Sequence, residues 1–251
     1  MDTKTQTEQT VSSSDPYPAS DPYPDWRGTA VSARGGVLAS APPPGACPGG
    51  GAGYQSTKRL LDIFGAFLLL LFCFPLMLVI ALLIKITSPG PVLFRQVRLG
   101  RTGRPFLIFK FRTMSINAEQ QLAVRPELRR QHEETFKIIN DPRITPLGKF
   151  LRRTSLDELP QLINVLSGSM SVIGPRPIVP HELNKYHPWG EKLLLVKPGL
   201  GGMWQVSGRS ATTYAERVRL DMHYIDFCCL RLDLLLLFRT VAAVLTCRGS
   251  S

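Results

Sequence analysis

The sequence predicts a mostly helical protein in which a membrane-embedded helical segment precedes a small, basic globular region. Three observations support this prediction. Residues 63–84 form a run of 22 residues without a charge, long enough to enter a bilayer deeply. The segment before this run is rich in Ser, Thr, Pro and Gly, and the region after it contains short apolar and amphipathic stretches typical of strands and helices.

Residues 1–57 have the composition of a flexible tail, with Asp-Pro-Tyr-Pro occurring twice and a glycine-rich stretch at 45–53. Such a segment buries too little apolar surface to offset its chain entropy. The tail holds three basic and five acidic side chains, a charge of −2, whereas the whole chain carries +11. The remainder therefore carries +13 (11 + 2). This excess favours partners that bear phosphate, such as anionic lipid, a nucleotide or nucleic acid.

The flanks of the apolar run predict a re-entrant hairpin over residues 58–87. Lys58 and Arg59 precede the run, and Lys85 and several arginines follow it. Positive charge favours the cytoplasmic side, so both ends are expected at the same membrane face. Pro75 lies near the middle, where it removes one helix hydrogen bond and forces a kink. A broken helix satisfies both constraints, and a single straight span with the tail outside is the alternative.

Residues 88–251 form the predicted globular domain, which begins with a Ser-Pro-Gly-Pro breaker. Residues 105–114 are short, aromatic and apolar, which predicts a strand. Residues 118–137 predict a polar helix that is interrupted at Pro126.

Two further segments of this domain have helical patterns. Residues 156–166 predict a short amphipathic helix, and its expected buried stripe is Leu156, Leu159, Ile163 and Leu166. Residues 230–247 are rich in leucine and carry only three charges, which predicts a helix that lies in the membrane interface.

The strongest candidates for chemistry are Asp157 and Glu158. Ser155 and Glu158 have the spacing of a capping box, and Asp157 in a first helical turn complements the helix dipole, so a structural explanation suffices for the pattern alone. The same physics supports catalysis. A carboxylate at a helix N-terminus stays ionised, and phosphate is attracted to the same amide groups. An ionised Asp157 could attack phosphorus, while Glu158 could bind Mg²⁺ or transfer a proton.

The basic surroundings of this pair favour the catalytic interpretation. Arg152 and Arg153 precede it, and Gly-Pro-Arg-Pro at 174–177 follows. Two prolines stiffen the backbone around Arg176, as a phosphate clamp requires. Four more arginines occur at every third position and predict either a solvated stripe or a surface for lipid phosphates or a nucleotide: Arg95, Arg98, Arg101 and Arg104.

Other residues carry weaker signals. The five cysteines contain no C-x-x-C pair, and the four histidines match no H-E-x-x-H spacing, so neither a zinc site nor a disulfide framework is indicated. Trp204 could stack on a base, but packing is the more common role of such a residue.

The chain resembles the bacterial sugar transferases, a family of monotopic phosphoglycosyl transferases. Matching runs occur in the family's order and cover nearly all of residues 58–251: KRLLD (58–62), SPGPVLFRQVRLGRTGRPFLIFKFRTM (88–114), LRRTSLDELPQLINVLSGSMSVIGPRP (151–177), VKPGLGGMWQVSGR (196–209) and LDMHYI (220–225).

The resemblance implies a mostly helical α/β fold, in which a re-entrant membrane helix-break-helix joins a small interfacial globular domain with amphipathic helices. It places the chain monotopically in the bacterial inner (cytoplasmic) membrane, with the catalytic domain on the cytoplasmic face. The implied reaction transfers a hexose 1-phosphate from a UDP-sugar to polyprenyl (undecaprenyl) phosphate and releases UMP through a covalent phosphosugar-Asp intermediate. This step initiates lipid-linked exopolysaccharide or other glycan assembly.

The resemblance also assigns residues. Asp157 corresponds to the nucleophile and Glu158 to the second dyad carboxylate, and the two together are the implied Mg²⁺ ligands. The implied phosphate- or substrate-binding residues are Arg152, Arg176, Lys58, Arg59, Asp62 and Arg112. The expected partners are a UDP-sugar, polyprenyl phosphate and membrane lipid, without nucleic acid, and a homodimer is compatible with this interpretation. One departure is Phe74-Pro75, where relatives often carry Ser-Pro.

Two other classes of function remain as alternatives. A membrane-tethered protein that binds anionic lipid or nucleic acid without catalysis would explain the charge and the apolar run, but not the carboxylate pair or the Gly-Pro-Arg-Pro motif. An inactive scaffold that retains the fold is the second alternative.

Overall fold

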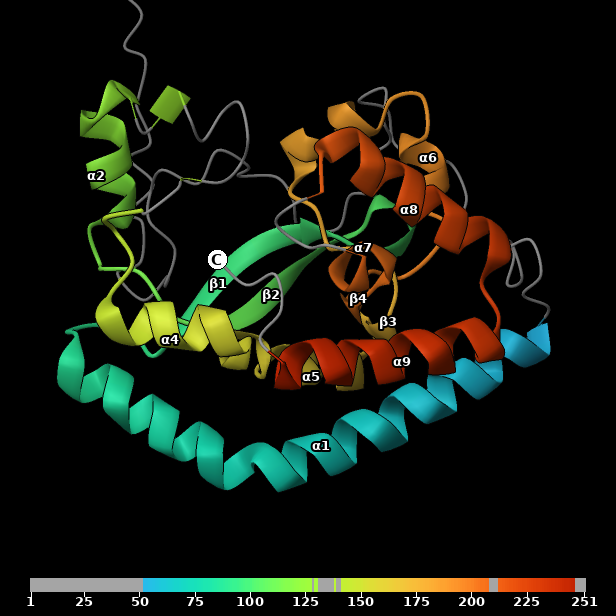
Figure 1. Ribbon diagram of the computed structural model, residues 1–251, viewed down its shortest axis with the longest axis horizontal. Helices are drawn as coiled ribbons and strands as arrows, with labels where there is room; N and C mark the ends of the chain where they lie inside the picture. Colours follow the sequence, from blue (N-terminus) through green and yellow to red (C-terminus); the bar gives the residue numbers. More distant parts are fainter. Residues whose placement is uncertain (1–51, 128, 131–137, 139–140, 208–211, 247–251) are drawn as a thin grey trace, which may run out of the picture.

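The computed structural model describes residues 52–127, 129–130, 138, 141–207 and 212–246 (Figure 1). The predicted tail up to residue 51 and the second half of the predicted polar helix, at 131–137, lie outside the described residues. The first half of that helix is confirmed as α2, Ala118–Val124.

A single long helix, α1 (Ala52–Thr87), contains the apolar run and is long and apolar enough to cross a membrane. Figure 1 shows it bent near its middle, so that both ends rise toward the rest of the protein. Pro75 lies inside this helix and accounts for the bend, because its nitrogen has no hydrogen to donate. The residues on both sides of the bend are helical, so α1 is one bent helix rather than two separate ones.

The helix starts at Ala52, earlier than the predicted boundary at residue 58. Tyr54, in this added turn, donates its hydroxyl hydrogen to Asp233 at 2.8 Å. The additional helical turn is therefore held by the Tyr54–Asp233 hydrogen bond, a tertiary contact that local composition does not reveal.

Two small sheets follow. β1 (Leu93–Leu99) and β2 (Pro105–Phe111) form an antiparallel hairpin, which confirms most of the strand predicted at 105–114. The 3-10 turn η1 (Arg101–Gly103) connects them. β3 (Ser171–Ile173) and β4 (Gly199–Gly201) pair in parallel.

The remaining elements are helices and turns. In chain order, they are α4 (Pro146–Thr154), η2 (Leu156–Glu158), α5 (Gln161–Ser167), η3 (Pro180–Tyr186), α6 (Gly190–Leu193), α7 (Met203–Val206), α8 (Tyr214–Phe227) and α9 (Leu230–Leu245). The helix predicted at 230–247 is thus confirmed as a helix.

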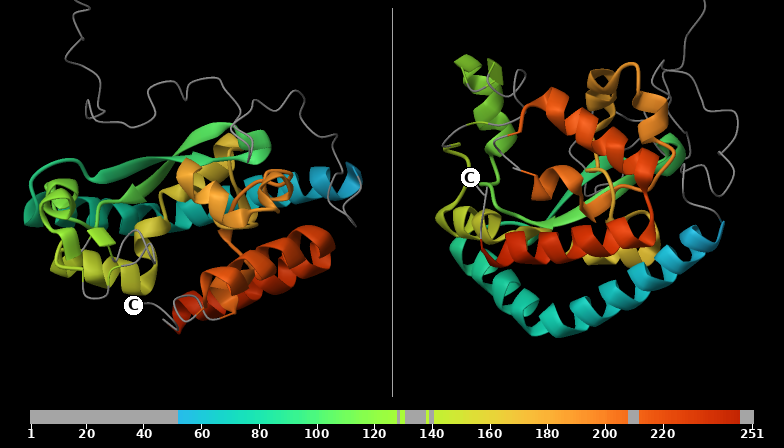
Figure 2. Two further views of the ribbon diagram at one scale, coloured as in Figure 1. Left: turned by 90° about the horizontal axis from the view of Figure 1, so that it is seen from above. Right: turned by 45° about the vertical axis from the view of Figure 1, so that its right-hand side comes forward.

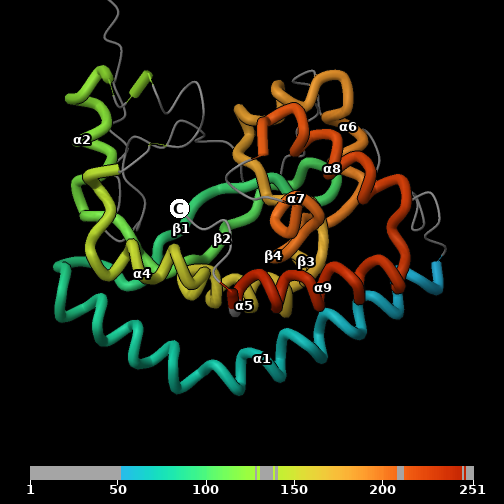
Figure 3. Tube along the Cα trace, viewed as in Figure 1, coloured from blue at the N-terminus to red at the C-terminus, as the bar shows by residue number. Residues whose placement is uncertain are grey.

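The elements are arranged in layers above α1. Helix α5 and strand β3 pack directly against it, α4 lies over its second arm and the start of α9 over its first turns, and the β1–β2 hairpin and α6 to α8 lie farther away (Figures 1 and 2). Figure 3 shows the start of α9 beside the first turns of α1, where Lys58 and Asp233 form an ion pair at 2.9 Å. Ala66 packs with α5 in one apolar cluster, and Ile80 and Ile84 pack with α4 in another. Both arms of the bent helix are therefore attached to the globular part.

The helix predicted at 156–166 is divided by Pro160 into η2 and α5. Leu162 and Val165 are buried, whereas Ile163 is 42% exposed, so its predicted place in the buried stripe is wrong. The stripe was placed on one uninterrupted helix, but α5 starts only at Gln161, and the preceding 3-10 turn changes which residues share a face.

Apolar side chains cover the outside of the helical layer. On α1, large apolar residues are exposed along the whole length of the helix, and on α9 the exposed ones are Leu234, Leu235, Phe238 and Val241. Soluble monomers rarely expose so large an apolar area. Contact with lipid, as predicted for both segments, would remove this surface from water.

Candidate active site

The tight turn η2 positions the carboxylate pair between α4 and α5. Ser155 ends α4 with a φ of 59°, in the left-handed region, and its N–H donates to the carbonyl of Arg152 at 3.2 Å. Its side chain makes no capping hydrogen bond, so the predicted capping box is wrong. The backbone turn, rather than a cap, holds Asp157 in a buried position, where it is 8% exposed.

Lys110 is the nearest cation to this pair. It lies on β2, and its ammonium donates to the Glu158 carboxylate at 2.6 Å. The Glu158 side chain is 27% exposed, so this ion pair is partly shielded from water. Sequence reasoning did not identify Lys110, although a single charge inside the apolar run Phe-Lys-Phe was an available signal.

The two carboxylates differ in pKa. Burial, together with the neighbouring charge of Glu158, raises the pKa of Asp157 to about 6, although Lys110 and Arg152 oppose the shift. Burial also disfavours ionisation of Glu158, but Lys110 and Arg176 outweigh it and hold its pKa below the usual value. Glu158 is therefore the stronger acid of the two, and Asp157, which the sequence predicts to stay ionised, is the weaker acid.

A close backbone contact places Arg152 beside Asp157. A Cβ on Gly148 of α4 would lie 2.0 Å from the carbonyl oxygen of Thr113, so only glycine lets α4 approach this segment. Arg152, one turn later, donates from Nε to the Thr113 hydroxyl at 2.9 Å. The Arg152 charge opposes the rise in the pKa of Asp157, which places Arg152 in the electrostatic environment of the dyad, as expected from the sequence.

The Gly-Pro-Arg-Pro loop is held on three sides. Gly174 donates to Gly201 at 2.9 Å, Pro175 accepts from Gly199 at 2.7 Å, and Arg98 donates to the carbonyl of Pro177 at 3.0 Å. These bonds fix the loop that presents Arg176.

The Arg176 guanidinium lies over the Trp204 ring, 5.3 Å from its centroid. A second guanidinium, that of Arg217, lies 5.4 Å from the same centroid. Trp204 thus packs against two cations, which agrees with the packing role favoured from sequence. Arg176 lowers the pKa of Glu158, which places it in the electrostatic environment of the dyad.

A buried network behind Arg176 was not predicted. Glu182 accepts from Arg217 at 3.1 Å and lies 3.9 Å from Arg98. Nearby, Asp221 accepts from the Tyr186 hydroxyl at 2.8 Å, and burial raises the pKa of Asp221 to about 6. No local pattern marks these residues, because their partners come from distant segments.

Three predicted binding residues on α1 bond to groups outside the dyad. Lys58 pairs with Asp233, and Arg59 donates to the carbonyl of Val165 at 2.6 Å. Asp62 accepts from the Val172 N–H at 2.9 Å. These bonds attach the first turns of α1 to α9, α5 and β3.

Arg112, the fourth such residue, uses its guanidinium on the loop after α1. It donates to the carbonyl of Ser88 at 2.8 Å and to that of Pro89. A substrate-binding role for these four residues remains a prediction.

The arginines spaced by three do not form one stripe. Arg95 lies over the Phe109 ring, Arg98 reaches the loop at Pro177, and Arg101 lines a pocket elsewhere. Residues three apart on a strand point to opposite faces, so a single solvated stripe is wrong, whereas contact of individual arginines with lipid phosphates or a nucleotide stays a prediction.

The residues present fit a magnesium ion. Asp157 and Glu158 offer adjacent carboxylate oxygens, and their mutual repulsion contributes to the raised pKa of Asp157, which a divalent cation would relieve. No cluster of three or more His, Cys, Asp and Glu side chains able to hold a metal is present in the described part of the chain. Further ligands would come from substrate phosphates and water, as is usual for Mg²⁺.

Fold and site together define a class of protein: a small domain joined to a helix long and apolar enough to enter a membrane, with a carboxylate pair set among cations. The chain belongs to the bacterial sugar transferase family, whose family model matches residues 53–247. The resemblance inferred from sequence is thereby confirmed.

Individual relatives agree with this assignment. The chain is 41% identical over 198 residues to the exopolysaccharide production protein ExoY of Sinorhizobium fredii, covering 77% of this chain and 88% of that protein. It is 44% identical over 198 residues to the undecaprenyl-phosphate galactose phosphotransferase of Salmonella typhimurium, covering 77% and 41%. It is 42% identical over 192 residues to the UDP-glucose:undecaprenyl-phosphate glucose-1-phosphate transferase of Escherichia coli, covering 73% and 39%. The chain thus spans less than half of these two longer relatives.

Proposed function

We propose that this bacterial sugar transferase is a phosphoglycosyl transferase, which moves a hexose 1-phosphate from a UDP-sugar to undecaprenyl phosphate and releases UMP. The observation that carries the proposal is the pair of a buried Asp157 and a partly exposed Glu158, set among the charges of Lys110, Arg152 and Arg176. Relatives named as undecaprenyl-phosphate sugar phosphotransferases support the same chemistry. The product would initiate exopolysaccharide or another lipid-linked glycan.

In the first step, an Asp157 carboxylate oxygen attacks the β-phosphorus of the UDP-sugar. A P–O bond forms as the P–O bond to UMP breaks, and UMP leaves with the electron pair. In the second step, a phosphate oxygen of undecaprenyl phosphate attacks the same phosphorus, and the Asp157 carboxylate departs. Two displacements thereby replace one direct transfer between two anionic substrates.

The residues around Asp157 have separate tasks in this scheme. Arg152 and Arg176 bind phosphate oxygens and offset the charge that accumulates during transfer. Lys110 keeps Glu158 ionised, and Glu158 in turn raises the pKa of Asp157. Mg²⁺ held by Asp157 and Glu158 would neutralise part of the negative charge on the diphosphate of the UDP-sugar.

We further propose that α1 is re-entrant in the cytoplasmic leaflet of the bacterial inner membrane, with domain 88–251 on the cytoplasmic face. The bend at Pro75, which brings both helix ends to one side, supports this arrangement. Single cysteines at exposed Thr57 and Thr87, in a chain otherwise free of cysteine, should both react only with a reagent applied from the cytoplasmic side. Reaction of the Thr57→Cys chain from outside would show a straight span instead.

The activity is tested by UMP release from a panel of UDP-hexoses in the presence of undecaprenyl phosphate. Asp157→Asn should abolish release while leaving membrane association intact, because only the nucleophile is changed. Asp226→Asn is the matched control, since Asp226 lies on the surface of α8 in an ion pair with Lys192. Absence of UMP release with every sugar would instead favour the non-catalytic lipid- or nucleic-acid-binding alternative.

A further inference from the structure

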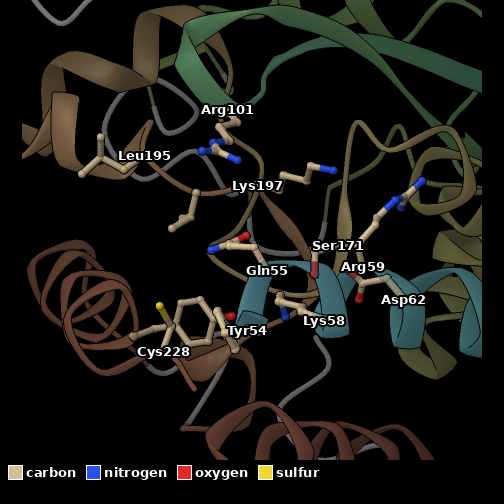
Figure 4. Close-up of a pocket in the computed structure, with 12 residues that line it drawn as sticks. Tyr54, Gln55, Lys58, Arg59, Asp62, Arg101, Ser171, Leu195, Lys197 and Cys228 are labelled. Carbon is tan, nitrogen blue, oxygen red and sulfur yellow. The ribbon is translucent and has the colours of Figure 1, made fainter. Parts of the chain in front are cut away.

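A basic pocket lies between the first turns of α1 and the globular part. Figure 4 shows Arg101 and Lys197 on one side of it and α1, with Gln55 and Lys58, on the other. Ser171, at the start of β3, lies between them. Four elements that are distant in sequence therefore build this pocket together.

Two groups in the pocket wall lack the partners that burial normally demands. Ser171 is 1% exposed, and its hydroxyl oxygen has no hydrogen-bond partner in the described structure. The Arg101 Nε is also buried, and none of the described residues accepts its hydrogen. Leaving a buried polar group unsatisfied costs about 1–3 kcal/mol, so both groups indicate a missing ligand with polar atoms.

The pocket carries excess positive charge. Lys58, Arg59, Arg101 and Lys197 contribute four cations, whereas Asp62 in the pocket and Asp233, the partner of Lys58, contribute two carboxylates (4 − 2 = +2). Burial and the neighbouring Arg59 lower the pKa of Lys197, because a further cation is unfavourable here. An anion in the pocket would relieve this repulsion and accept hydrogen bonds from Ser171 and Arg101.

This pocket is separate from the dyad. Arg101 follows the end of β1 at Leu99, whereas Lys110, the partner of Glu158, is opposite Phe94 on the same hairpin. Phe94 and Leu99 are five positions apart, so at about 3.3 Å per residue their backbone positions lie about 17 Å apart along the hairpin. The pocket and the dyad thus lie at different parts of the hairpin, and Lys110, Asp157 and Glu158 do not line the pocket.

The position of the pocket favours a lipid headgroup as the ligand. Lys58 faces the pocket, and the exposed apolar surface of α1 begins within the next two helical turns, at Leu60 and Phe64. If α1 enters the membrane as proposed above, the mouth lies where apolar chains meet water, which is the depth of lipid phosphates.

We propose that this pocket binds the phosphate of an anionic membrane phospholipid, as a second lipid site distinct from the catalytic dyad. The phosphate accepts hydrogen bonds from Ser171, Arg101 and Lys197, and the acyl chains lie along the apolar start of α1. The site rests on the membrane placement of α1, but it requires no phosphoglycosyl transfer. Bound lipid would fix the first arm of α1 against β3.

The test titrates the purified full-length protein in neutral detergent with short-chain phosphatidylglycerol and, separately, with short-chain phosphatidylcholine. We expect phosphatidylglycerol to bind at least about tenfold more tightly. Arg101→Gln combined with Lys197→Gln should abolish this preference. Ser171→Ala should weaken binding about three- to tenfold, the worth of one hydrogen bond, without lowering the melting temperature, because its hydroxyl has no partner to lose.

Arg104→Gln is the matched control, because Arg104 is an exposed arginine close to Arg101 that does not line the pocket. This change should leave phosphatidylglycerol binding within about twofold of the wild type. Asp157→Asn should also retain the lipid preference, so failure of the catalytic proposal and failure of the lipid site are distinguishable.

Several results would overturn the lipid assignment. Unchanged phosphatidylglycerol affinity in the double variant would exclude the pocket as its site. Equal affinity for inorganic phosphate would identify a general phosphate site. A raised KM of the double variant for the UDP-sugar or for undecaprenyl phosphate, with lipid binding intact, would assign the pocket to a substrate instead.

Discussion

Replacing Lys110 with methionine tests how the protein controls the acidity of its nucleophile. The Lys110 ammonium is 2.6 Å from Glu158 and lowers the pKa of Asp157, which is nevertheless raised to about 6. Methionine keeps much of the side-chain length and removes the charge. A nearby opposite charge typically lowers a carboxyl pKa by about 1–3 units. Because Lys110 contacts Glu158 rather than Asp157, we take the lower figure, about 1 unit.

The sign of the effect follows from the proposed role of Asp157. The carboxylate must be ionised to attack phosphorus, and kcat/KM reports the ionisation of the free enzyme. With Mg²⁺ entering together with the diphosphate of the UDP-sugar, Asp157 of the free enzyme is metal-free, so the acid limb should lie near pH 6 in the wild type. In Lys110→Met it should lie near pH 7, a difference of about 1.4 kcal/mol. At pH 7 the ionised fraction of Asp157 would fall from about 0.9 to about 0.5.

The assay is the rate of UMP release between pH 5 and 9 at UDP-sugar concentrations below KM. Lys149→Met is the matched control, because Lys149 is an exposed lysine on α4 whose removal changes the net charge equally. Solvent screening should keep its acid limb within about 0.3 units of the wild type. An acid limb of Lys110→Met that stays in place, or moves to lower pH, would refute this account of the dyad.

Three further predictions concern the dyad and the packing around it. Glu158→Gln removes the like charge beside Asp157, so the acid limb of the residual activity should shift by about 1 unit to lower pH. A shift to higher pH would contradict the repulsion between the Asp157 and Glu158 carboxylates. Asp233→Ala leaves Lys58 and two tyrosine hydroxyls without their common partner, and should lower the free energy of unfolding in detergent by about 3 kcal/mol. The control Asp226→Ala should lower it by less than about 1 kcal/mol. Equal losses in the two variants would show that Asp233 has no special structural role. Gly148→Ala should destabilise the chain by about 2 kcal/mol or more, because its Cβ would meet the Thr113 carbonyl at 2.0 Å, and a melting temperature equal to that of the wild type would contradict this packing.

Local patterns predicted the features that depend on nearby residues. The bend in α1 follows from one proline in an apolar run, and β2 and α9 follow from their composition. The proximity of Arg152 to Asp157 was also accessible, because α4 and η2 are adjacent in the chain.

Features that depend on tertiary contacts were missed or misplaced. Ser155 has the residue type and spacing of a cap, yet it adopts the left-handed conformation that ends the preceding helix. Ile163 was placed in the buried stripe because Pro160 was not taken as the start of a new helix. Lys110 and Glu182 acquire their roles from partners more than 30 positions away, which no periodicity can show.

The central claim is that Asp157 forms a covalent bond to the transferred phosphosugar. Incubating the wild-type protein with a UDP-sugar but no undecaprenyl phosphate, followed by mass analysis of the protein and its peptides, tests it most directly. The account predicts up to one UMP released per protein and a mass increase of one hexose phosphate on the peptide that contains Asp157, with neither in Asp157→Asn. Full turnover by Asp157→Asn, or a hexose phosphate attached to Glu158 instead, would contradict it.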